Sequence, residues 1–363
     1  MLVSLCVIAY NEEAALKGLF DNIAAQNYPK PQTQIVFVND CSTDGTKRLM
    51  QGFADKYKSY HSVVVADCRV KSQAAAWNTA ILNSAGEIII RLDAHSTIPA
   101  NFISENVRCI ESGEYVCGGG RPTKAMEETP WQMTLLAAED SLFGSSFACY
   151  RRESEKRRYV DSVFHAAYRR EVFRTVGGFN ECLGRTEDNE LHYRIRKAGY
   201  KICCEPKIKS YQYIRSGLIK MMKQKYGNGL WVALTLGVSP GCISLFHLAP
   251  LALVLMLIVF SVMAGLGCAA PLVLLCCAYL FFDLTITAGV FINRKKYLQF
   301  VALPVIFSLL HLSYGIGSLV GIIKMPFWRI NARKKSPLGI QRVKDKLMKE
   351  EGENNGLITP DKA

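Results

Sequence analysis

The sequence almost lacks charge over a long part of its C-terminal third. Between residues 241 and 323 the only charged side chains are Asp283 and the Arg-Lys-Lys run at 294–296. Apolar runs in this part reach the ~20 residues that cross a bilayer as a helix, which excludes a wholly soluble protein. We expect membrane spans at about 243–266 and 271–292. A third apolar segment, 300–323, is long enough to span, but its topology stays open because a basic stretch follows it and Pro and Gly residues lie within it.

The sequence also lacks the cysteine patterns of disulfide or zinc frameworks. Its thirteen cysteines are scattered, and none form a CxxC pair. The adjacent pairs at 203–204 and 276–277 suit neither an ordinary disulfide nor a zinc site. The first residues have no basic region or cleavage site of a signal peptide. We therefore expect the part outside the membrane to lie in a reducing, cytoplasmic compartment.

Several ligand-binding motifs are missing as well. Neither GxGxxG after the first strand nor GxxxxGK[ST] occurs, which excludes the usual dinucleotide and P-loop sites. The net charge of +13 is not accompanied by zinc knuckles, a helix-turn-helix pattern or basic repeats interleaved with aromatics. We therefore expect no nucleic-acid partner. Beside membrane spans, such a basic balance indicates anionic lipid headgroups.

The first half of the sequence alternates strand and helix patterns. Apolar strand patterns cover residues 2–10, 34–40, 61–67 and 86–94. Helical patterns cover 11–26, 42–57 and 72–84, and the alternation loosens after about residue 110. This order predicts an α/β fold with a Rossmann-like, mostly parallel sheet that binds its ligand at the carboxyl ends of the strands.

Polar or acidic side chains end three of these predicted strands. They are Tyr10 and Glu12, which follow Ala9 at the end of the first strand, Asp40 at the end of the second, and Asp93 and His95 at the end of the fourth. One such aspartate would usually be a helix cap, but three coincident strand ends predict a ligand site. Without a glycine-rich phosphate loop, a pyrophosphate needs another neutralising group. A divalent cation held by carboxylate and imidazole would serve.

Five motifs in order resemble those of the family 2 glycosyltransferases, enzymes with the A-type nucleotide-sugar fold. They are "VIAYNEE", "VNDCSTDGT", "LDAH", "FHAAYRREVFRTVGGFNE" and "TEDNELHYRIRKAGY". Within the family the chain most resembles membrane-associated exopolysaccharide glucosyltransferases of the succinoglycan-biosynthesis type. The likeness covers about residues 2–231.

The resemblance implies a nucleotide-sugar site at these strand ends. Ala9, Tyr10 and Glu12 would border the base and ribose of a nucleotide diphosphate. Asp40 would accept a hydrogen bond from uracil.

The resemblance also implies a metal site. Asp93 and His95 stand where the family carries an Asp-x-Asp motif, which contacts ribose and holds a divalent metal, here Mn²⁺ or Mg²⁺. His95 replaces the second aspartate of that motif. Imidazole is a good ligand for Mn²⁺ and a poorer one for Mg²⁺, so the identity of the metal stays open.

A second acidic centre follows at Glu187 and Asp188. Acids at a helix start are ordinarily dipole-matched caps, and composition alone favours that interpretation. The resemblance instead makes Asp188 the base that takes the proton of the acceptor hydroxyl, with Glu187 helping to set its pKa. It also assigns a sugar and acceptor region, made of Arg169, Arg170, Gly177, Gly178, Phe179 and Gln224. The Gln-x-x-Arg-Trp motif of processive synthases is absent around Gln224, which favours addition of a single sugar.

The resemblance and the apolar pattern together predict the organisation and activity of the chain. We expect a catalytic domain at 1–235, a membrane domain at 236–326 and a basic tail at 327–363. The protein would be a multi-pass protein of a bacterial inner membrane with its catalytic domain in the cytoplasm. It would be an inverting, metal-dependent transferase that moves a hexose from a UDP-sugar, first of all UDP-glucose, to a lipid-linked glycan. Other polysaccharide-assembly enzymes would be its partners.

Alternatives remain open at this point. The donor could be GDP-mannose or UDP-GalNAc, and the acceptor a polyprenyl phosphate. A protein of a different class, a non-catalytic nucleotide-sugar binding protein tethered to the membrane, would also fit the altered Asp-x-Asp motif.

Overall fold

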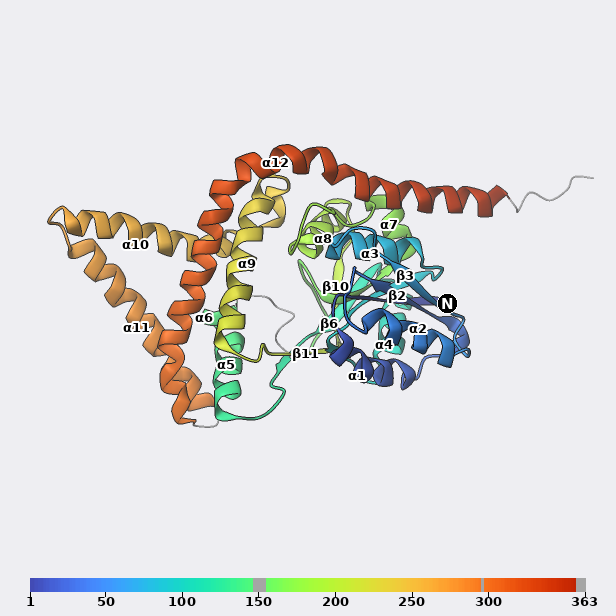
Figure 1. The fold of residues 1–363 in the computed structure, drawn as a ribbon, viewed down its shortest axis with the longest axis horizontal. Helices are drawn as coiled ribbons and strands as arrows, with labels where there is room; N and C mark the ends of the chain where they lie inside the picture. The colour runs from blue at the N-terminus through green and yellow to red at the C-terminus, as the bar shows by residue number, and fades with distance from the viewer. Residues whose placement is uncertain (146–154, 295–296, 357–363) are drawn as a thin grey trace, which may run out of the picture. The chain divides into compact units, whose positions relative to one another are not determined.

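The computed structural model describes residues 1–145, 155–294 and 297–356 (Figure 1). The chain divides into two compact units. Unit 1 comprises Met1–Pro122, Arg152–Gln212 and Asn331–Ala363, and unit 2 comprises Thr123–Arg151 and Tyr213–Ile330. The predicted catalytic region 1–235 therefore extends into unit 2, and most of the predicted tail lies in unit 1.

Unit 1 contains an eight-stranded mixed sheet in the order β3-β2-β1-β4-β9-β6-β10-β8. The strands are β1 (Val3–Ala9), β2 (Thr33–Asn39), β3 (Ser62–Asp67), β4 (Ile88–Asp93), β6 (Val116–Gly120), β8 (Arg158–Tyr159), β9 (Phe164–Arg169) and β10 (Ile202–Lys209). β1 pairs in parallel with β2 and β4, and β2 with β3. The predicted mostly parallel sheet is thus confirmed. β9, which the sequence pattern did not predict, runs antiparallel between β4 and β6.

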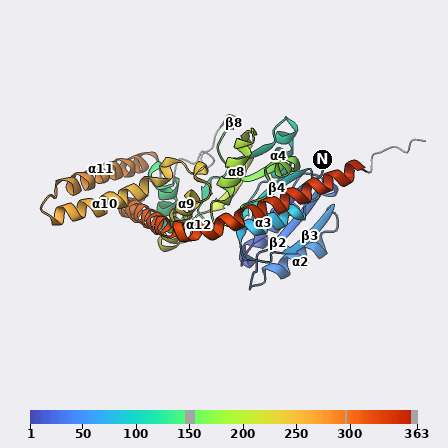
Figure 2. The same ribbon diagram turned by 90° about the horizontal axis from the view of Figure 1, so that it is seen from above.

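Helices cover both faces of this sheet (Figure 2). α1 (Glu13–Ala24), α2 (Thr46–Lys56) and α4 (Phe102–Glu111) share one apolar cluster, and α3 (Gln73–Leu82), α7 (Arg170–Val176) and α8 (Glu187–Lys197) share the other. The alternation of side chains along a strand explains the two clusters. In β1, Leu5 and Val7 belong to the first cluster and Cys6 to the second. A strand buried on both faces therefore reads as a continuous apolar run.

The last helix, α12 (Leu303–Gly356), contributes its final part to unit 1. We call residues 331–356 the C-terminal segment. Its Val343 and Leu347 are 0% and 1% exposed and belong to the apolar cluster around α3, α7 and α8. Three ion pairs join the segment to the rest of unit 1: Arg170–Glu350 at 3.1 Å, Arg174–Glu351 at 2.9 Å and Arg342–Glu181 at 2.6 Å. Residues 331–356 of the predicted basic tail are therefore packed on the rest of this unit.

Unit 2 is mainly helical. It holds α5 (Pro130–Asp140), α6 (Leu142–Ser145), α9 (Leu218–Leu236), α10 (Ala249–Gly265), α11 (Ala270–Asn293) and the first part of α12. Short 3-10 turns lie at Pro240–Cys242, Leu245–Leu248 and Leu298–Ala302, and a further turn, Lys30–Gln32, belongs to unit 1. The short strand β7 (Thr123–Lys124) also belongs to unit 2, whereas in unit 1 β5 (Ser96–Thr97) pairs antiparallel with β11 (Tyr211–Tyr213) through Tyr211 and Gln212.

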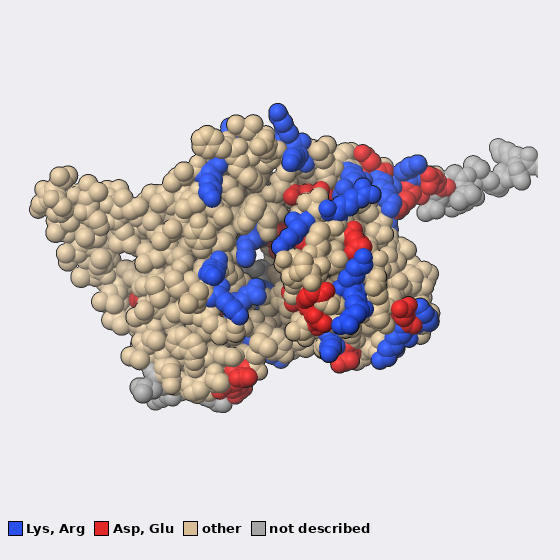
Figure 3. Space-filling model, viewed as in Figure 1, with Lys and Arg blue, Asp and Glu red and all other residues tan. Residues whose placement is uncertain are grey.

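Among the residues that the structure describes, three helical segments are long and apolar enough to cross a membrane. They are Leu245–Gly265, Ala270–Asn293 and Gln299–Glu353, the last of which continues beyond its apolar part. Lys, Arg, Asp and Glu are almost absent from the surface of α10 and α11 seen in Figure 3. The three predicted apolar segments are confirmed as helices. Residues 303–356 are helical throughout, so the third segment is not broken at its Pro and Gly residues.

Candidate active site

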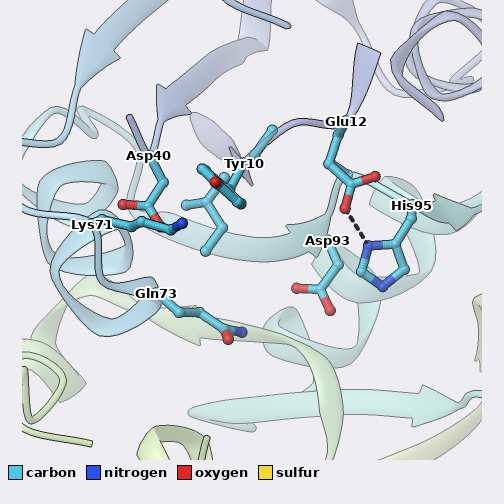
Figure 4. A pocket seen from close by; sticks show the side chains of 10 residues that line it. Tyr10, Glu12, Asp40, Lys71, Gln73, Asp93 and His95 are labelled. Carbon is cyan, nitrogen blue, oxygen red and sulfur yellow. Dashed lines mark hydrogen bonds and ion pairs between the residues drawn. The ribbon is translucent and has the colours of Figure 1, made fainter. Parts of the chain in front are cut away.

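A cleft lies at the carboxyl ends of β1, β2 and β4, the edge at which the sequence predicts a ligand (Figure 4). It encloses about 280 Å³ and is lined by Ile8, Ala9, Tyr10, Glu12, Asp40, Lys71, Gln73, Asp93, Ala94 and His95. All the residues predicted from the three strand ends are in this lining. The structure adds Lys71 and Gln73 to this lining. Lys71 lies just before α3 and Gln73 is its first residue, so neither belongs to the acidic motifs at the strand ends.

Two turns with left-handed backbone present the cleft residues of β1 and β2. Asn11, directly after Tyr10, has φ 53°, and Cys41, directly after Asp40, has φ 60°. The side chain of Asn11 joins the two turns, because its Oδ1 accepts the backbone N–H of Thr43 at 2.8 Å. A cysteine in this conformation costs roughly 1–2 kcal/mol, and such strain concentrates at functional sites. The turns therefore fix where Tyr10 and Asp40 lie.

Asp40 and Lys71 lie at one end of the cleft (Figure 4). Asp40 is 7% exposed, and its Oδ1 accepts the backbone N–H of Ser72 at 3.0 Å. Burial raises the pKa of Asp40, although the Ser72 hydrogen bond acts in the opposite direction. The Lys71 ammonium lies 3.6 Å from the ring centroid of Tyr10, as a cation–π contact. This end offers an aromatic face, an acceptor and a cation.

Asp93 lies at the other end of the cleft and is held from two sides (Figure 4). Its Oδ1 is 3.8 Å from the Arg91 guanidinium, and its Oδ2 is 3.8 Å from Nε2 of the buried His165. Burial alone would raise the pKa of Asp93, but His165 and Arg91 outweigh it and hold the pKa below its ordinary value. Burial lowers the pKa of His165 to about 4, so this ring is neutral at physiological pH. Asp93 is therefore a carboxylate anion.

His95, beside Asp93, is contacted at both ring nitrogens. Its Nδ1 lies 3.1 Å from Oε1 of Glu12, and its Nε2 lies 3.4 Å from Nε2 of Gln212. Gln212 reaches the ring because β11 pairs with β5, which places Gln212 opposite Ser96. His95 therefore stands between a carboxylate on one side and an amide on the other.

Arg91 joins the cleft to the second acidic centre. Its Nη2 lies 3.8 Å from Asp93 and 3.4 Å from Oε1 of Glu187, at the start of α8. Arg91 and Glu187 are 5% and 2% exposed. Burial, and then the neighbouring charge of Asp188, raise the pKa of Glu187 to about 7. Asp188 is half-buried, and its Oδ1 accepts the backbone N–H of Asn189 at 2.8 Å. Arg91 was missed as a site residue, although a charge inside a triple-isoleucine strand signals it.

The donor set at the Asp93 end fits a divalent cation shared with a substrate. No cluster of three or more His, Cys, Asp or Glu side chains suited to a metal occurs among the described residues. Asp93 and His95 thus supply two ligand side chains side by side. Mg²⁺ and Mn²⁺ sites commonly take one or two protein ligands and complete their shell with phosphate oxygens and water. The residues present therefore fit a metal that binds together with a diphosphate.

The structure does not bring Arg169 and Arg170 to the cleft. Arg169 pairs with Ile88, the first residue of β4, whereas Asp93 is its last. The guanidinium of Arg169 donates to the carbonyl oxygens of Glu114 and Ile110, at 3.1 and 2.8 Å. Arg170 donates to the carbonyl oxygens of Gly86 and Ser84. Both arginines thus hold backbone at the opposite edge of the sheet.

The remaining predicted residues fall in different places. A Cβ on Gly177 or Gly178 would overlap Ile340 or Val343 of the C-terminal segment, and Gly177 has φ 75°. Phe179 is 2% exposed, with its ring centroid 5.7 Å from the Arg91 guanidinium. Gln224 lies on α9 in unit 2, where its Oε1 accepts from Arg215 at 3.4 Å. Of this group, only Phe179 touches the Arg91 network among the contacts described.

Comparison with known proteins identifies the class. Residues 4–177 match the model of Glycosyl transferase family 2. The chain is 29% identical over 232 residues to the succinoglycan biosynthesis protein ExoA of Rhizobium meliloti, covering 62% of this chain and 68% of that protein. A dolichyl N-acetyl-alpha-D-glucosaminyl phosphate 3-beta-D-2,3-diacetamido-2,3-dideoxy-beta-D-glucuronosyltransferase of Methanococcus voltae is 24% identical, with 89% of this chain and 97% of that protein covered.

A solved structure confirms the fold. The mannosyltransferase PcManGT of Pyrobaculum calidifontis, in complex with GDP-Man and Mn²⁺, superposes with a TM-score of 0.59 at 19% identity. The match covers 88% of this chain and 86% of that one. The sheet and its acidic cleft thus define a glycosyltransferase domain of the A-type fold, as predicted. The chain belongs to glycosyltransferase family 2.

Proposed function

We propose that the protein is an inverting, metal-dependent hexosyltransferase that moves one sugar from a UDP-sugar, first of all UDP-glucose, to a lipid-linked glycan. The observation that carries the proposal is the Arg91 bridge. The Arg91 guanidinium lies 3.8 Å from Asp93 and 3.4 Å from Glu187, and Asp188 is the next residue after Glu187. A donor site and a proton acceptor must be this close for a hydroxyl to attack the sugar.

The cleft suits the two halves of a nucleotide diphosphate. Tyr10 and Asp40 offer an aromatic face and an acceptor for the base. Ala9 and Glu12 also line the cleft, with the Glu12 carboxylate beside His95. Asp93 and His95 would hold a divalent cation against the diphosphate. When bound, the cation neutralises the charge that develops on the departing diphosphate. The Mn²⁺ in the complex of the mannosyltransferase PcManGT supports this role.

Asp188 takes the proton of the attacking hydroxyl. Glu187 is buried against Arg91, whereas Asp188 is half-buried at the N-terminus of α8, so Asp188 is the carboxylate open to an acceptor. A base on the face opposite the diphosphate would invert the configuration at the anomeric carbon.

The membrane segments support a lipid-linked acceptor. Three helices long enough to span a bilayer would confine the enzyme to the plane in which such an acceptor diffuses. The likeness to a succinoglycan biosynthesis protein supports a role in polysaccharide assembly, together with other enzymes of that process. We place the catalytic domain at the cytoplasmic face of a bacterial inner membrane, where nucleotide sugars are made.

A radiolabelled donor panel incubated with membranes that contain the protein tests the proposal. UDP-glucose should label the lipid extract. If only GDP-mannose or only UDP-GalNAc labels it, that nucleotide sugar is the donor instead of UDP-glucose. The mannosyltransferase complex with GDP-Man is the observation that favours GDP-mannose as the second candidate.

Asp188→Asn should leave donor binding nearly intact and lower turnover by roughly 10²-fold or more. Unchanged turnover would refute the role of Asp188, and binding without transfer from any donor would indicate a non-catalytic protein.

A further inference from the structure

The environment of His95 raises a question that the proposed metal site does not answer. An imidazole can bind a metal through either ring nitrogen, and only the nitrogen without a proton has a lone pair. The second residue of an Asp-x-Asp motif has no such ambiguity. A histidine in this place needs a neighbour that selects one tautomer and one ring orientation.

Glu12 is such a neighbour. Its Oε1 lies 3.1 Å from Nδ1 of His95, a distance at which a carboxylate accepts the Nδ1–H. A carboxylate has no proton to donate at this position, so the bond requires the proton on Nδ1. Glu12 and His95 are 27% and 35% exposed at their side chains, so the contact is partly shielded from water.

The contact on the other side of the ring agrees with this tautomer. Nε2 of His95 faces the amide nitrogen of Gln212 at 3.4 Å. An amide NH₂ donates and does not accept, so this contact is a hydrogen bond only in the tautomer whose Nε2 carries the lone pair. The two contacts come from different elements, the start of α1 and strand β11, and they require the same proton arrangement.

The position of Glu12 is itself fixed. Its backbone N–H donates to Oγ1 of Thr46 at 2.8 Å, and its carbonyl oxygen accepts the N–H groups of Ala15 and Leu16 at 3.0 Å. Glu12 thus begins α1 and is tied to the start of α2. Its carboxylate points toward His95 at the same end of the cleft, as Figure 4 shows.

We infer that Glu12 is a positioning residue that holds His95 with Nδ1 protonated, so that the lone pair of Nε2 can pass from its 3.4 Å contact with Gln212 to a divalent cation beside Asp93. An imidazole binds a metal only as the neutral ring. Glu12 and Asp93 then supply two negative charges near the cation, the same number as the two aspartates of an Asp-x-Asp motif. The charge of Glu12 lies farther from the cation, because the imidazole ring of His95 stands between them. Glu12 acts through His95 and not as a ligand.

This inference rests on the proposed metal-dependent function, and its test measures metal binding without turnover. The affinity for Mn²⁺ in the presence of UDP is measured by the electron paramagnetic resonance of free Mn²⁺, using full-length protein in detergent at one pH. Glu12→Ala should weaken Mn²⁺ binding by roughly 10–100-fold, the effect usual for a carboxylate that orients a metal-binding histidine. Glu12→Gln keeps an oxygen that accepts the Nδ1–H and should lose less.

A double-mutant cycle separates positioning from direct contact. His95→Ala should weaken binding at least as much as Glu12→Ala, and adding Glu12→Ala to it should cause no further loss. Glu13→Gln is the matched control, because this adjacent carboxylate contacts Gly45 and Arg48 instead of His95 and should leave Mn²⁺ affinity unchanged. Wild-type affinity in Glu12→Ala, or losses that add in full, would overturn the inference.

Two further measurements complete the test. In metal-free protein with ¹⁵N-labelled histidine, the His95 ring should show a protonated Nδ1 and a bare Nε2, and the opposite tautomer would overturn the inference whatever the stability of the variants. Asp93→Asn distinguishes the two levels of the proposal. If Asp93→Asn and His95→Ala both bind Mn²⁺ as the wild type does, the metal-dependent function itself fails. If both weaken binding and Glu12→Ala does not, only the role of Glu12 fails.

Discussion

Replacing Arg91 with methionine tests whether one buried cation holds the two acidic centres together. Methionine keeps the length and apolar contacts of the side chain but removes the charge. Glu187 and Asp93 would then lie buried, 2% and 8% exposed, without the guanidinium at 3.4 and 3.8 Å. Removing one partner of a buried ion pair costs about 3–5 kcal/mol.

The expected change in melting temperature follows from this cost. A domain of about 150–250 residues loses roughly 2–4 °C per kcal/mol, so Arg91→Met should lower the melting temperature by roughly 6–20 °C. Differential scanning fluorimetry of the full-length protein in detergent at pH 8, above the pKa of Glu187, measures the shift. Arg108→Met is the matched control, because its ion pair with Glu105 at 2.6 Å has an arginine side chain 66% exposed. An exposed pair contributes only about 0–1 kcal/mol.

A second variant decides whether the unpaired charge causes the loss. Adding Glu187→Gln to Arg91→Met removes the buried carboxylate left alone and should recover much of the lost melting temperature. The reasoning is refuted if Arg91→Met melts at the wild-type temperature. It is also refuted if the double variant melts no higher than Arg91→Met alone.

Three further outcomes are expected. Leu347→Ala should destabilise the protein by about 2–5 kcal/mol because Leu347 is 1% exposed in the core, whereas Met348→Ala, at a 50% exposed position, should melt as the wild type does. The raised pKa of Glu187, about 7 against 4.5, favours folding below about pH 4.5, and this contribution is lost as the pH rises through 7. Glu187→Gln should therefore flatten the fall of the melting temperature across that window, and an unchanged slope would contradict the burial of this carboxylate. Chelation with EDTA should abolish transfer to the lipid extract. Mn²⁺ should restore transfer better than Mg²⁺, because imidazole, here the proposed ligand His95, suits Mn²⁺ better. Equal rescue by the two metals would count against His95 as a ligand.

The first half of the fold was predictable because its patterns are local. Strands such as β4 read as apolar runs bounded by turns, and the acidic ends of parallel strands must meet at one edge. Strand β9 was not predictable in this way. Its six residues include histidine and arginine, and its antiparallel place between β4 and β6 depends on pairing with residues far away in the sequence.

The residues that line the cleft were predictable, but the buried interactions that hold them in place were not. Asp40, Asp93 and His95 follow strands, whereas Arg91 acts on Glu187, 96 positions later in the sequence, and no local pattern connects them. The sequence predicts a basic tail at 327–363, which includes the C-terminal segment, because charged residues dominate the composition there. Its one signal was the spacing of Ile340, Val343 and Leu347, which lie on one helical face.

The embedded C-terminal segment bears on how this enzyme can be handled outside a membrane. A water-soluble form could be sought by cutting the chain after its last apolar stretch. This cut would expose the apolar cluster that Val343 and Leu347 cover. It would also remove Glu350 and Glu351, the ion-pair partners of Arg170 and Arg174. A soluble form has to retain residues 331–356, either joined by a linker or added back as a peptide. The distant end of the polypeptide is as much a part of the catalytic body as its first strand.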